Sequence, residues 1–319
     1  MYIKPKYNIL DWKDFNNECQ YAKKEWLYLS KNYLNTVTHQ MSSKEYLHQR
    51  HTVFRIDMLM YLYARLRRQQ GDTRLGVLCG LLTHLLDYFY DHRSMSNNDF
   101  AFAEQLIETR KDYHPYDPLT KALAELFSMF WSMVPNPSLV SRTLARMLET
   151  QRDSLQQVNE RITLGNLEVL TRAKGHRSLC LYYSIANPDF DIEEAEHLEK
   201  FGYYMQYMDD LEDFYEDRFE HRYSCISSVT DGCDEASRLL DIALPDLATF
   251  YKGKKFDFEF FSNTVMFYHN FLMKSCQRRE RLQYLPQGVQ RLASLRKAFF
   301  SSFIPLFYLT PLELIDSIK

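Results

Sequence analysis

Apolar side chains recur at helical spacing along almost the whole chain, and no segment alternates apolar and polar positions like a half-buried strand. The predicted helices cover about 11–36, 42–69, 73–91, 97–110, a segment from 118, 137–162, 164–185, a long segment from 192, 233–251, 256–283 and 287–304. No fixed-period repeat and no linker rich in Pro, Gly or Ser divides the chain. We therefore expect one all-α domain over residues 1–319.

Capping residues mark several predicted helix starts. Ser42 and Asp191 are each followed three residues later by Glu, which is the spacing of a capping box. Asp117 and Asn136 each precede a proline, and proline is favoured at the first position of a helix. A polar pair at 231–232 predicts a break between two helices.

Composition excludes several classes of protein. The 319 residues are 45% hydrophobic, enough for a sizeable core, while 9 Gly and 10 Pro are too few turn-formers for a strand-rich fold. A net charge of -3 provides no basic surface for nucleic acid, and no glycine-rich phosphate loop is present. Six cysteines without C-x-x-C spacing and an apolar run at 298–309 that is too short to span a bilayer predict a cytoplasmic protein without a transmembrane segment.

One predicted helix carries a dense acidic stripe. At 100° per residue, four side chains fall within about 80° of one another over about 16 Å, and we call them the second acidic motif: Gln206, Asp209, Asp213 and Asp217. Like charges one turn apart destabilise a helix, so the stripe indicates either a solvated face or a cation opposite it. Glu212 and Glu216 are rotated about 80 to 100° from Asp213, and we expect them to flank the stripe.

A second acidic pair ends the helix predicted over 73–91. Asp87 and Asp91 lie one turn apart and form the first acidic motif. The positions that precede it on the same face are small or polar: Thr83 or His84, Gly80 and Gly76. Gly inside a helix costs about 1 kcal/mol relative to Ala. Two glycines in register indicate close packing on another helix, or a cavity wall kept bare for an elongated ligand, or both.

Two aspartate motifs on separate helices suit a diphosphate held through Mg²⁺. Carboxylate oxygens are hard ligands that Mg²⁺ accepts, and the metal stabilises diphosphate as a leaving group. Exclusion of water would protect a carbocation, and aromatic faces would stabilise it by about 0.5–2 kcal/mol each. The chain contains 23 Tyr and 22 Phe, most of which we expect in the core.

The pairing of these motifs resembles the class I isoprenoid synthase superfamily. It is most similar to the branch of squalene synthases, phytoene synthases and bacterial large-terpene synthases such as tetraprenyl-β-curcumene synthases. Phytoene synthases carry Gln, Asn three residues later, and acidic residues at seven and eleven, and the second acidic motif keeps this spacing with Asp209 in place of Asn. Residues 87–100 resemble the first motif of the large-terpene group, and 152–157 and 179–190 are weakly similar to it.

The resemblance implies an antiparallel helical bundle around a central cavity, with three Mg²⁺ ions between two facing acidic helices. It implies metal-ligand roles for both motifs and catalytic roles for four of their carboxylates: Asp87 and Asp91 on one wall, and Asp213 and Asp217 on the other, with Asp209 as a further ligand. Gln206 would be a polar neighbour that binds diphosphate. Thr83, His84, Gly80 and Gly76 would line the substrate pocket.

Departures from the family pattern bear on the reaction. Squalene and phytoene synthases place Arg two or three residues before the first motif, where this chain has His84 and Leu85, and the Arg-Gly that follows their second motif is absent here. These differences favour a terpene synthase that ionises one prenyl diphosphate of C15–C25 (farnesyl, geranylgeranyl or geranylfarnesyl) to a cyclic or linear product. A prenyltransferase that condenses two prenyl diphosphates is the alternative.

Diphosphate also needs cationic side chains. The best placed in the sequence are Lys174 and Arg177 around Gly175, which is a predicted bend, and Arg218 and Arg222 after the second acidic motif. For each one, a surface charge or a helix C-terminal partner is the competing interpretation.

Two other classes remain open. Glu45-x-x-His48 and Glu194-x-x-His197 match the Glu-x-x-His pattern of di-iron carboxylate bundles, although both lie beside capping boxes where Glu is expected. A non-catalytic helical scaffold would leave both acidic motifs unexplained. The sequence does not fix the oligomeric state, and a homodimer is one option.

Overall fold

A computed structural model describes residues 9–34, 43–91, 95–108, 113–158, 161–219 and 221–283. Every regular element in these ranges is helical: α1 (Ile9–Tyr33), α3 (Ser43–Leu66), α4 (Thr73–Asp91), α5 (Asn97–Ile107), α6 (Pro118–Met133), α7 (Pro137–Ser154), η1 (Leu155–Val158), α8 (Leu164–Ala186), α9 (Ile192–Phe219), α10 (Val229–Phe250), η2 (Lys252–Lys254) and α11 (Lys255–Gln283). The all-α prediction is confirmed. The helix predicted over 287–304 and the apolar run at 298–309 lie outside the described residues.

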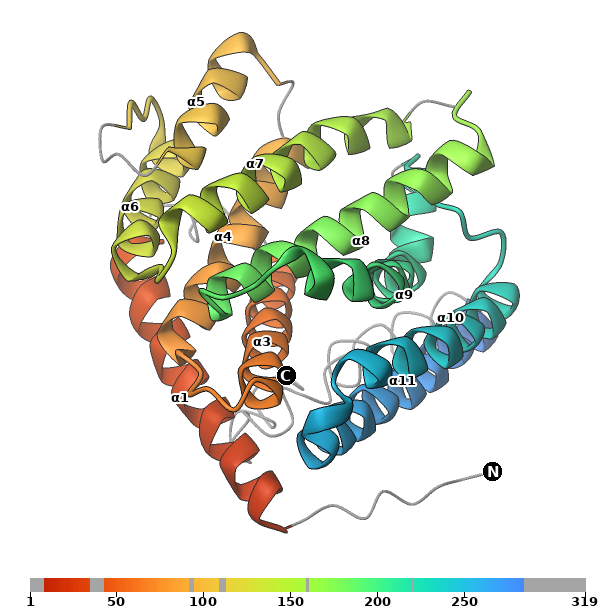
Figure 1. Cartoon of the computed structure of the whole chain (residues 1–319). Helices are drawn as coiled ribbons and strands as arrows, with labels where there is room; N and C mark the ends of the chain where they lie inside the picture. The colour runs from red at the N-terminus through yellow and green to blue at the C-terminus, as the bar shows by residue number, and fades with distance from the viewer. Residues whose placement is uncertain are drawn as a thin grey trace.

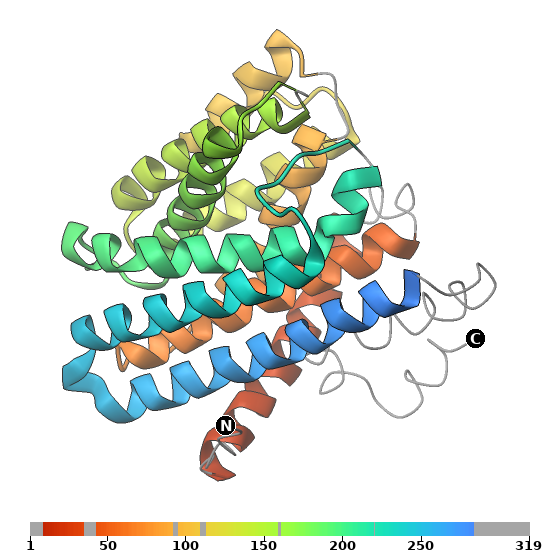
Figure 2. The same ribbon diagram turned by 90° about the vertical axis from the view of Figure 1, so that its right-hand side faces the viewer.

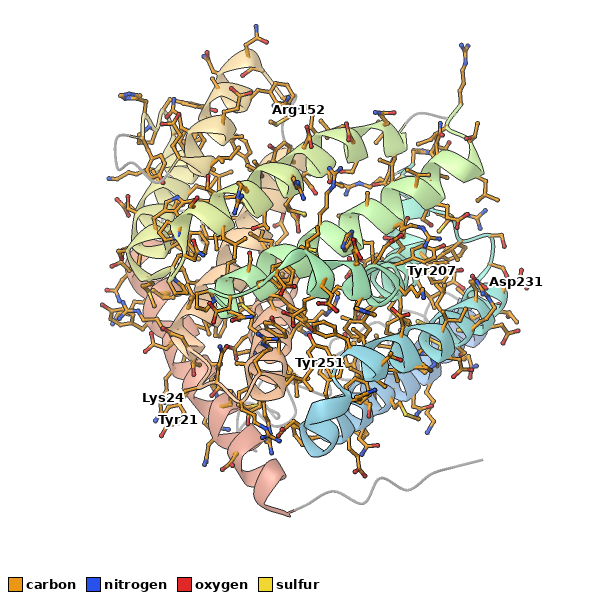
Figure 3. All side chains as sticks on the ribbon, in the orientation of Figure 1. Tyr21, Lys24, Arg152, Tyr207, Asp231 and Tyr251 are labelled. Atoms are coloured by element: carbon orange, nitrogen blue, oxygen red, sulfur yellow. The ribbon has the colours of Figure 1, made fainter. Side chains whose placement is uncertain are left out.

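Most predicted caps form as hydrogen bonds. Asp117 accepts from the backbone N of Thr120 at 2.8 Å, and Asn136 accepts from Leu139 N at 3.2 Å. Asp191 accepts from Glu194 N at 2.9 Å, but the Glu194 side chain accepts a hydrogen bond from Tyr251 instead of completing a capping box. Figure 3 labels Tyr251, which directly follows α10.

α5 begins at Asn97, as predicted, and its cap is Ser96, which forms a capping box with Asp99. The predicted start of α10 is wrong. α10 begins after Ser228, whose side chain accepts from Asp231 N, so the polar pair at 231–232 lies in the first turn of a helix. Pro245 also lies inside α10 without ending it.

The helices form a bundle with α8 and α9 at its centre. Figure 1 shows α3 and α4 on one side of this pair and α10 and α11 on the other. In the view turned by 90°, α10 and α11 run side by side (Figure 2). α9 packs on both α8 and α10, α7 packs on α8, and α4 packs on α3, α1 and α6. The second acidic motif therefore lies on the central helix α9.

Glycines allow the closest helix crossings. A Cβ atom at Gly175 would lie 2.0 Å from the backbone oxygen of Gly202, so α8 and α9 touch through their backbones and α8 continues through Gly175 without the predicted bend. On α4, a Cβ at Gly80 would lie 2.4 Å from Val53 Cα. A Cβ at Gly76 would lie 2.4 Å from Asp57 Oδ1, also on α3. Close packing on α3 thus accounts for both α4 glycines.

One buried apolar cluster extends from Cys19 in α1 to Cys276 in α11. Aromatic rings make up much of it, and the rings of Tyr63 and Tyr183 stack with centroids 3.6 Å apart. Beside them, buried Asn187 donates to the Tyr63 hydroxyl at 3.2 Å. No helix within the described residues is both long and apolar enough to cross a bilayer.

Candidate active site

A cavity of about 500 Å³ lies among α3, α4, α7, α8, α9 and α11, and we call it the central cavity. Its described lining contains both carboxylates and cations together with a larger apolar part. Because helices from both halves of the chain contribute, folding brings Asp87 of the first acidic motif to the same cavity as the second acidic motif, more than a hundred residues later in the sequence.

The first acidic motif reaches the cavity from α4. Asp87 lines it and accepts a hydrogen bond from Gln151 of α7 at 3.3 Å. One turn earlier, Thr83 also lines the cavity, and its hydroxyl lies 3.1 Å from that of Tyr182. Asp91 is the last residue of α4, and its side chain is outside the described part.

Three predicted pocket residues are misplaced. His84 is buried and does not line the cavity; its ring lies behind that of His48, at a centroid distance of 5.5 Å. Gly80 and Gly76 face α3 rather than the cavity. The prediction of a bare groove along α4 is therefore wrong, because helix packing occupies the space over both glycines.

The second acidic motif lies on the opposite wall, and all four of its side chains line the cavity. Gln206 donates through Nε2 to Asp210 at 2.9 Å and to Asp209 at 3.3 Å. This places a neutral donor at the start of the stripe, one turn before the first carboxylates. Asp213 and Asp217 follow along the same helix face.

Arg55 of α3 bridges the acidic stripe and was not predicted. Its two terminal nitrogens lie 2.6 Å from Asp209 Oδ1 and 2.7 Å from Glu212 Oε2, and its side chain is 29% exposed. Burial alone would lower the Arg55 pKa, but Tyr268, Glu212 and Asp209 together raise it above its ordinary value. Glu212 lines the cavity, so its assignment as a flanking residue is wrong. The Glu216 side chain is outside the described part.

Asp210 is a further unpredicted member of this wall. It is buried, lines the cavity and accepts a hydrogen bond from Thr171 of α8 at 3.0 Å. Burial raises the pKa of Asp210, against the effect of the Gln206 hydrogen bond. Burial and the neighbouring Asp210 also raise the pKa of Asp217 to about 7, which Arg222 opposes. The wall thus contains more negative charge than its own cations offset.

Two of the four predicted diphosphate-binding cations face the cavity. Lys174 lines it next to the α8–α9 backbone crossing, and Arg222 lines it from the segment after α9. Arg177 instead points to α7, where it donates to Thr150 at 2.6 Å and to the Arg146 backbone oxygen at 3.1 Å. Arg218 is exposed and lies over the Phe214 ring at 5.1 Å, so neither of these two reaches the cavity.

The charged lining fits a divalent metal. Six described carboxylates line the cavity (Asp87, Asp209, Asp210, Glu212, Asp213 and Asp217) against three cations (Arg55, Lys174 and Arg222), a formal excess of three negative charges. No three acidic, His or Cys side chains in the described part already stand in metal-binding geometry. Mg²⁺ does not require such a cage, because it is usually bound by one or two carboxylates together with water and phosphate oxygens.

Much of the uncharged cavity wall is apolar. Aliphatic and Met side chains come from α3, α7, α8, α9 and α11, among them Ile56, Leu59, Met147, Leu179, Met208 and Leu272. Three tyrosines, at positions 90, 182 and 268, add aromatic faces. Burial raises the pKa of Tyr268. Burial also raises the pKa of Tyr182, although its hydrogen bond to Thr83 has the opposite effect. Both phenols are therefore neutral at physiological pH.

The Glu-x-x-His pairs do not meet in one site. Glu45 lies in the first turn of α3, whereas Glu194 lies 3.5 Å from Arg67, just beyond the other end of that helix. At 1.5 Å per residue these positions are about 30 Å apart. His48 lines the central cavity, while His197 contacts Asp246 of α10 at 3.5 Å. This separation does not favour a di-iron centre.

We compared the chain with protein-family models, with curated proteins and with solved structures, and none of the three comparisons found a match. Arguments about function therefore rest on the cavity and its residues.

Proposed function

We propose that this chain is a class I terpene synthase that ionises a single prenyl diphosphate and releases a cyclic or linear terpene and diphosphate. The observation that carries the proposal is that Asp87 of α4 and the second acidic motif of α9 line one cavity, together with Lys174 and Arg222. Carboxylates facing cations in a cavity with apolar walls suit a substrate that has an anionic head and a hydrocarbon tail.

The cavity volume supports one substrate molecule over two. About 500 Å³ lies in the lower half of the range of about 300–1,000 Å³ for ligand pockets. A terpene synthase holds one prenyl chain, whereas a prenyltransferase must hold two. The helical bundle with two acidic walls is also the architecture that the resemblance to class I synthases implies.

Each group of residues has a role in the proposed reaction. Asp87, Asp209, Asp213 and Asp217 would hold Mg²⁺, which when bound withdraws charge from the diphosphate leaving group. Lys174 and Arg222 neutralise the departing diphosphate oxygens directly. The apolar wall excludes water, and the faces of the three tyrosines stabilise a carbocation.

Arg55 holds the acidic wall together before metal binds. Its guanidinium contacts Asp209 and Glu212. While no metal is bound, this positive charge reduces the repulsion between the two carboxylates. A cation at Asp209 Oδ1 would compete with this contact, and Arg55 would then be available to bind the diphosphate.

Turnover of prenyl diphosphates tests the proposal. The purified chain is incubated with farnesyl, geranylgeranyl and geranylfarnesyl diphosphate, with Mg²⁺ or with a chelator, and both released diphosphate and hydrocarbon products are measured. We expect Mg²⁺-dependent release from at least one of them. Failure with all three would contradict the proposal. Products containing two prenyl units would instead indicate the prenyltransferase.

A further inference from the structure

A second cavity of about 310 Å³ lies between the C-terminal half of α3 and the start of α4. Its other walls come from α1 and from the ends of α6 and α8. The central cavity contacts α4 only near its C-terminal end, at Thr83 and beyond. The two cavities therefore lie toward opposite ends of α4.

Three carboxylates from different elements converge on the second cavity: Glu18 of α1, Asp57 of α3 and Asp72 of the α3–α4 connection. Burial, and then Glu18 and Asp72, raise the pKa of Asp57 well above its usual range. Burial also raises the pKa of Glu18, which a hydrogen bond from Thr73 opposes and Asp72 reinforces. The three groups thus lie close enough to repel one another when ionised.

Of the three carboxylates, Asp57 has the largest unfavourable free energy of burial. Its side chain is 1% exposed, and its Oδ2 has no hydrogen-bond partner within the described structure. The space beside its other oxygen exists because residue 76 is glycine, since a Cβ there would lie 2.4 Å from Oδ1. A glycine inside a helix and an unpartnered buried carboxylate each destabilise a protein. Close packing of α4 on α3 explains the glycine, but it does not explain the unpartnered carboxylate that the glycine faces.

No cation of the described chain neutralises the cluster. Glu18 accepts from the Thr73 hydroxyl at 2.6 Å, and Asp72 accepts from Leu75 N at 3.0 Å, so both of these donors are neutral. On α1, Lys24 is exposed, and its Nζ lies 5.7 Å from the centroid of the Tyr21 ring. Figure 3 labels both residues at the outer side of α1. Among the described lining side chains, none is Lys or Arg.

The shape and chemistry of the cavity select the kind of cation. The three carboxylates come from separate elements around a cavity whose other walls include the amides of Gln69 and Gln70 and the apolar side chains of Met60 and Met133. Ammonium groups satisfy separated carboxylates through several N–H donors, and a short alkyl chain suits the apolar walls.

We propose that the second cavity binds a small organic dication of the alkyl diamine class between Glu18, Asp57 and Asp72. This site is separate from the proposed diphosphate chemistry and does not depend on it. The amine neutralises Asp57, which the protein leaves unpartnered, and its second ammonium group lies between the other two carboxylates.

Calorimetry and thermal unfolding of the full chain test this proposal at constant ionic strength. The probe is 1,4-diaminobutane, with n-butylamine, 1,4-butanediol and MgCl₂ as comparison compounds. We expect saturable binding of one diamine per chain with a rise in Tm, binding of the monoamine about tenfold weaker, and none of the diol. No saturable binding of the diamine would overturn the proposal, as would Mg²⁺ competing for the same site more tightly than the diamine.

Variants locate the binding. Asp57→Asn and, independently, Glu18→Gln each remove one charge and are expected to weaken diamine binding about tenfold or more. Glu125→Gln on the exposed side of α6 is the matched control and leaves binding unchanged. Equal binding to all three variants and to the unsubstituted chain would show that the diamine only screens surface charge, and the proposal would then be wrong.

Discussion

The central cavity and the second cavity use the same two helices, α3 and α4, in opposite ways. In the central cavity the charged residue of α3 is Arg55, which contacts two carboxylates of α9. Two residues later on α3, Asp57 lines the second cavity, whose other described lining residues are carboxylates and neutral groups. One cavity therefore contains its own cation, and the other contains none from the described chain.

The two cavities therefore differ in how the negative charge of their carboxylates is compensated. Carboxylates that contact Arg are compensated in part without any ligand, so a metal that binds them must compete with that Arg. Carboxylates without a partner keep an uncompensated cost until a ligand or a proton arrives. Asp209 of the central cavity thus has a cation partner in the described structure, whereas Asp57 of the second cavity has none.

The largest expected effect distinguishes the cavities by catalysis. Asp213→Asn removes a proposed metal ligand in the middle of the α9 stripe while leaving an isosteric side chain. We expect turnover of the prenyl diphosphate to fall by about 10²–10³-fold, because stabilisation of the leaving group is lost. Diphosphate release under single-turnover conditions measures the effect.

Asp57→Asn is the matched substitution in the other cavity, and we expect it to leave turnover within about twofold. Asp153→Asn, on the exposed face of α7, controls for general loss of charge. Equal loss of turnover in the Asp213 and Asp57 variants would mean that the two cavities form one functional unit.

A smaller effect tests whether α4 really separates the cavities. Gly80→Ala forces a Cβ to within 2.4 Å of Val53 Cα, which is backbone and cannot move aside without shifting α3. We expect a loss of about 3 kcal/mol in the free energy of unfolding, measured by urea titration, since overpacking typically costs about 1–3 kcal/mol.

Gly165→Ala is the control for this substitution. It lies in the first turn of α8, and an added Cβ there would meet no atom within 4 Å, so alanine should leave stability unchanged or raise it by up to about 0.5 kcal/mol. If Gly80→Ala folds normally and instead shortens the preferred substrate, the space over Gly80 is a substrate groove and the packing interpretation fails.

The pH dependence of stability should distinguish Asp57 from an ordinary carboxylate. Its folded-state pKa lies above its unfolded value, so the stability associated with protonated Asp57 is present at low pH and is lost as pH rises through the folded pKa. Asn cannot ionise. Asp57→Asn should therefore match the unsubstituted chain near pH 4 and exceed it by about 1–2 kcal/mol at pH 8. Thermal unfolding across this range measures the difference, and equal curves would show that Asp57 has a cation partner.

Sequence patterns predicted the helices because periodicity and caps are local. Asp117 and Asn136 cap α6 and α7 through bonds that span three residues. The start of α10 was predicted wrongly because the polar pair at 231–232 indicates a break between helices, whereas Ser228, three residues earlier, caps α10. The sequence alone could not show whether Gly76 and Gly80 pack on another helix or line a cavity, because only the position of α3 distinguishes these two alternatives.

The site was predicted in part for a similar reason. Spacing on one helix groups Asp209, Asp213 and Asp217 correctly, but whether Glu212 joins them depends on which neighbour supplies a cation. That neighbour, Arg55, and also Asp57 interrupt the apolar run from Val53 to Leu66. Charged residues within an apolar run were the available signal for both cavities.

The smallest predicted effect concerns Arg55 as a competitor of metal. With Arg55 bound to Asp209 and Glu212, a cation gains Asp209 Oδ1 as a ligand only in the fraction of molecules in which the contact has opened, which weakens the apparent affinity of a metal site that includes this oxygen. Arg55→Gln removes the competitor, and half-saturation by Mg²⁺ should occur at about three- to tenfold lower concentration, measured by calorimetry without substrate. Arg55→Lys keeps the charge and should lie between the two. Weaker Mg²⁺ binding by Arg55→Gln would contradict the competition, because it would mean that Arg55 orders the metal ligands instead of occupying their place.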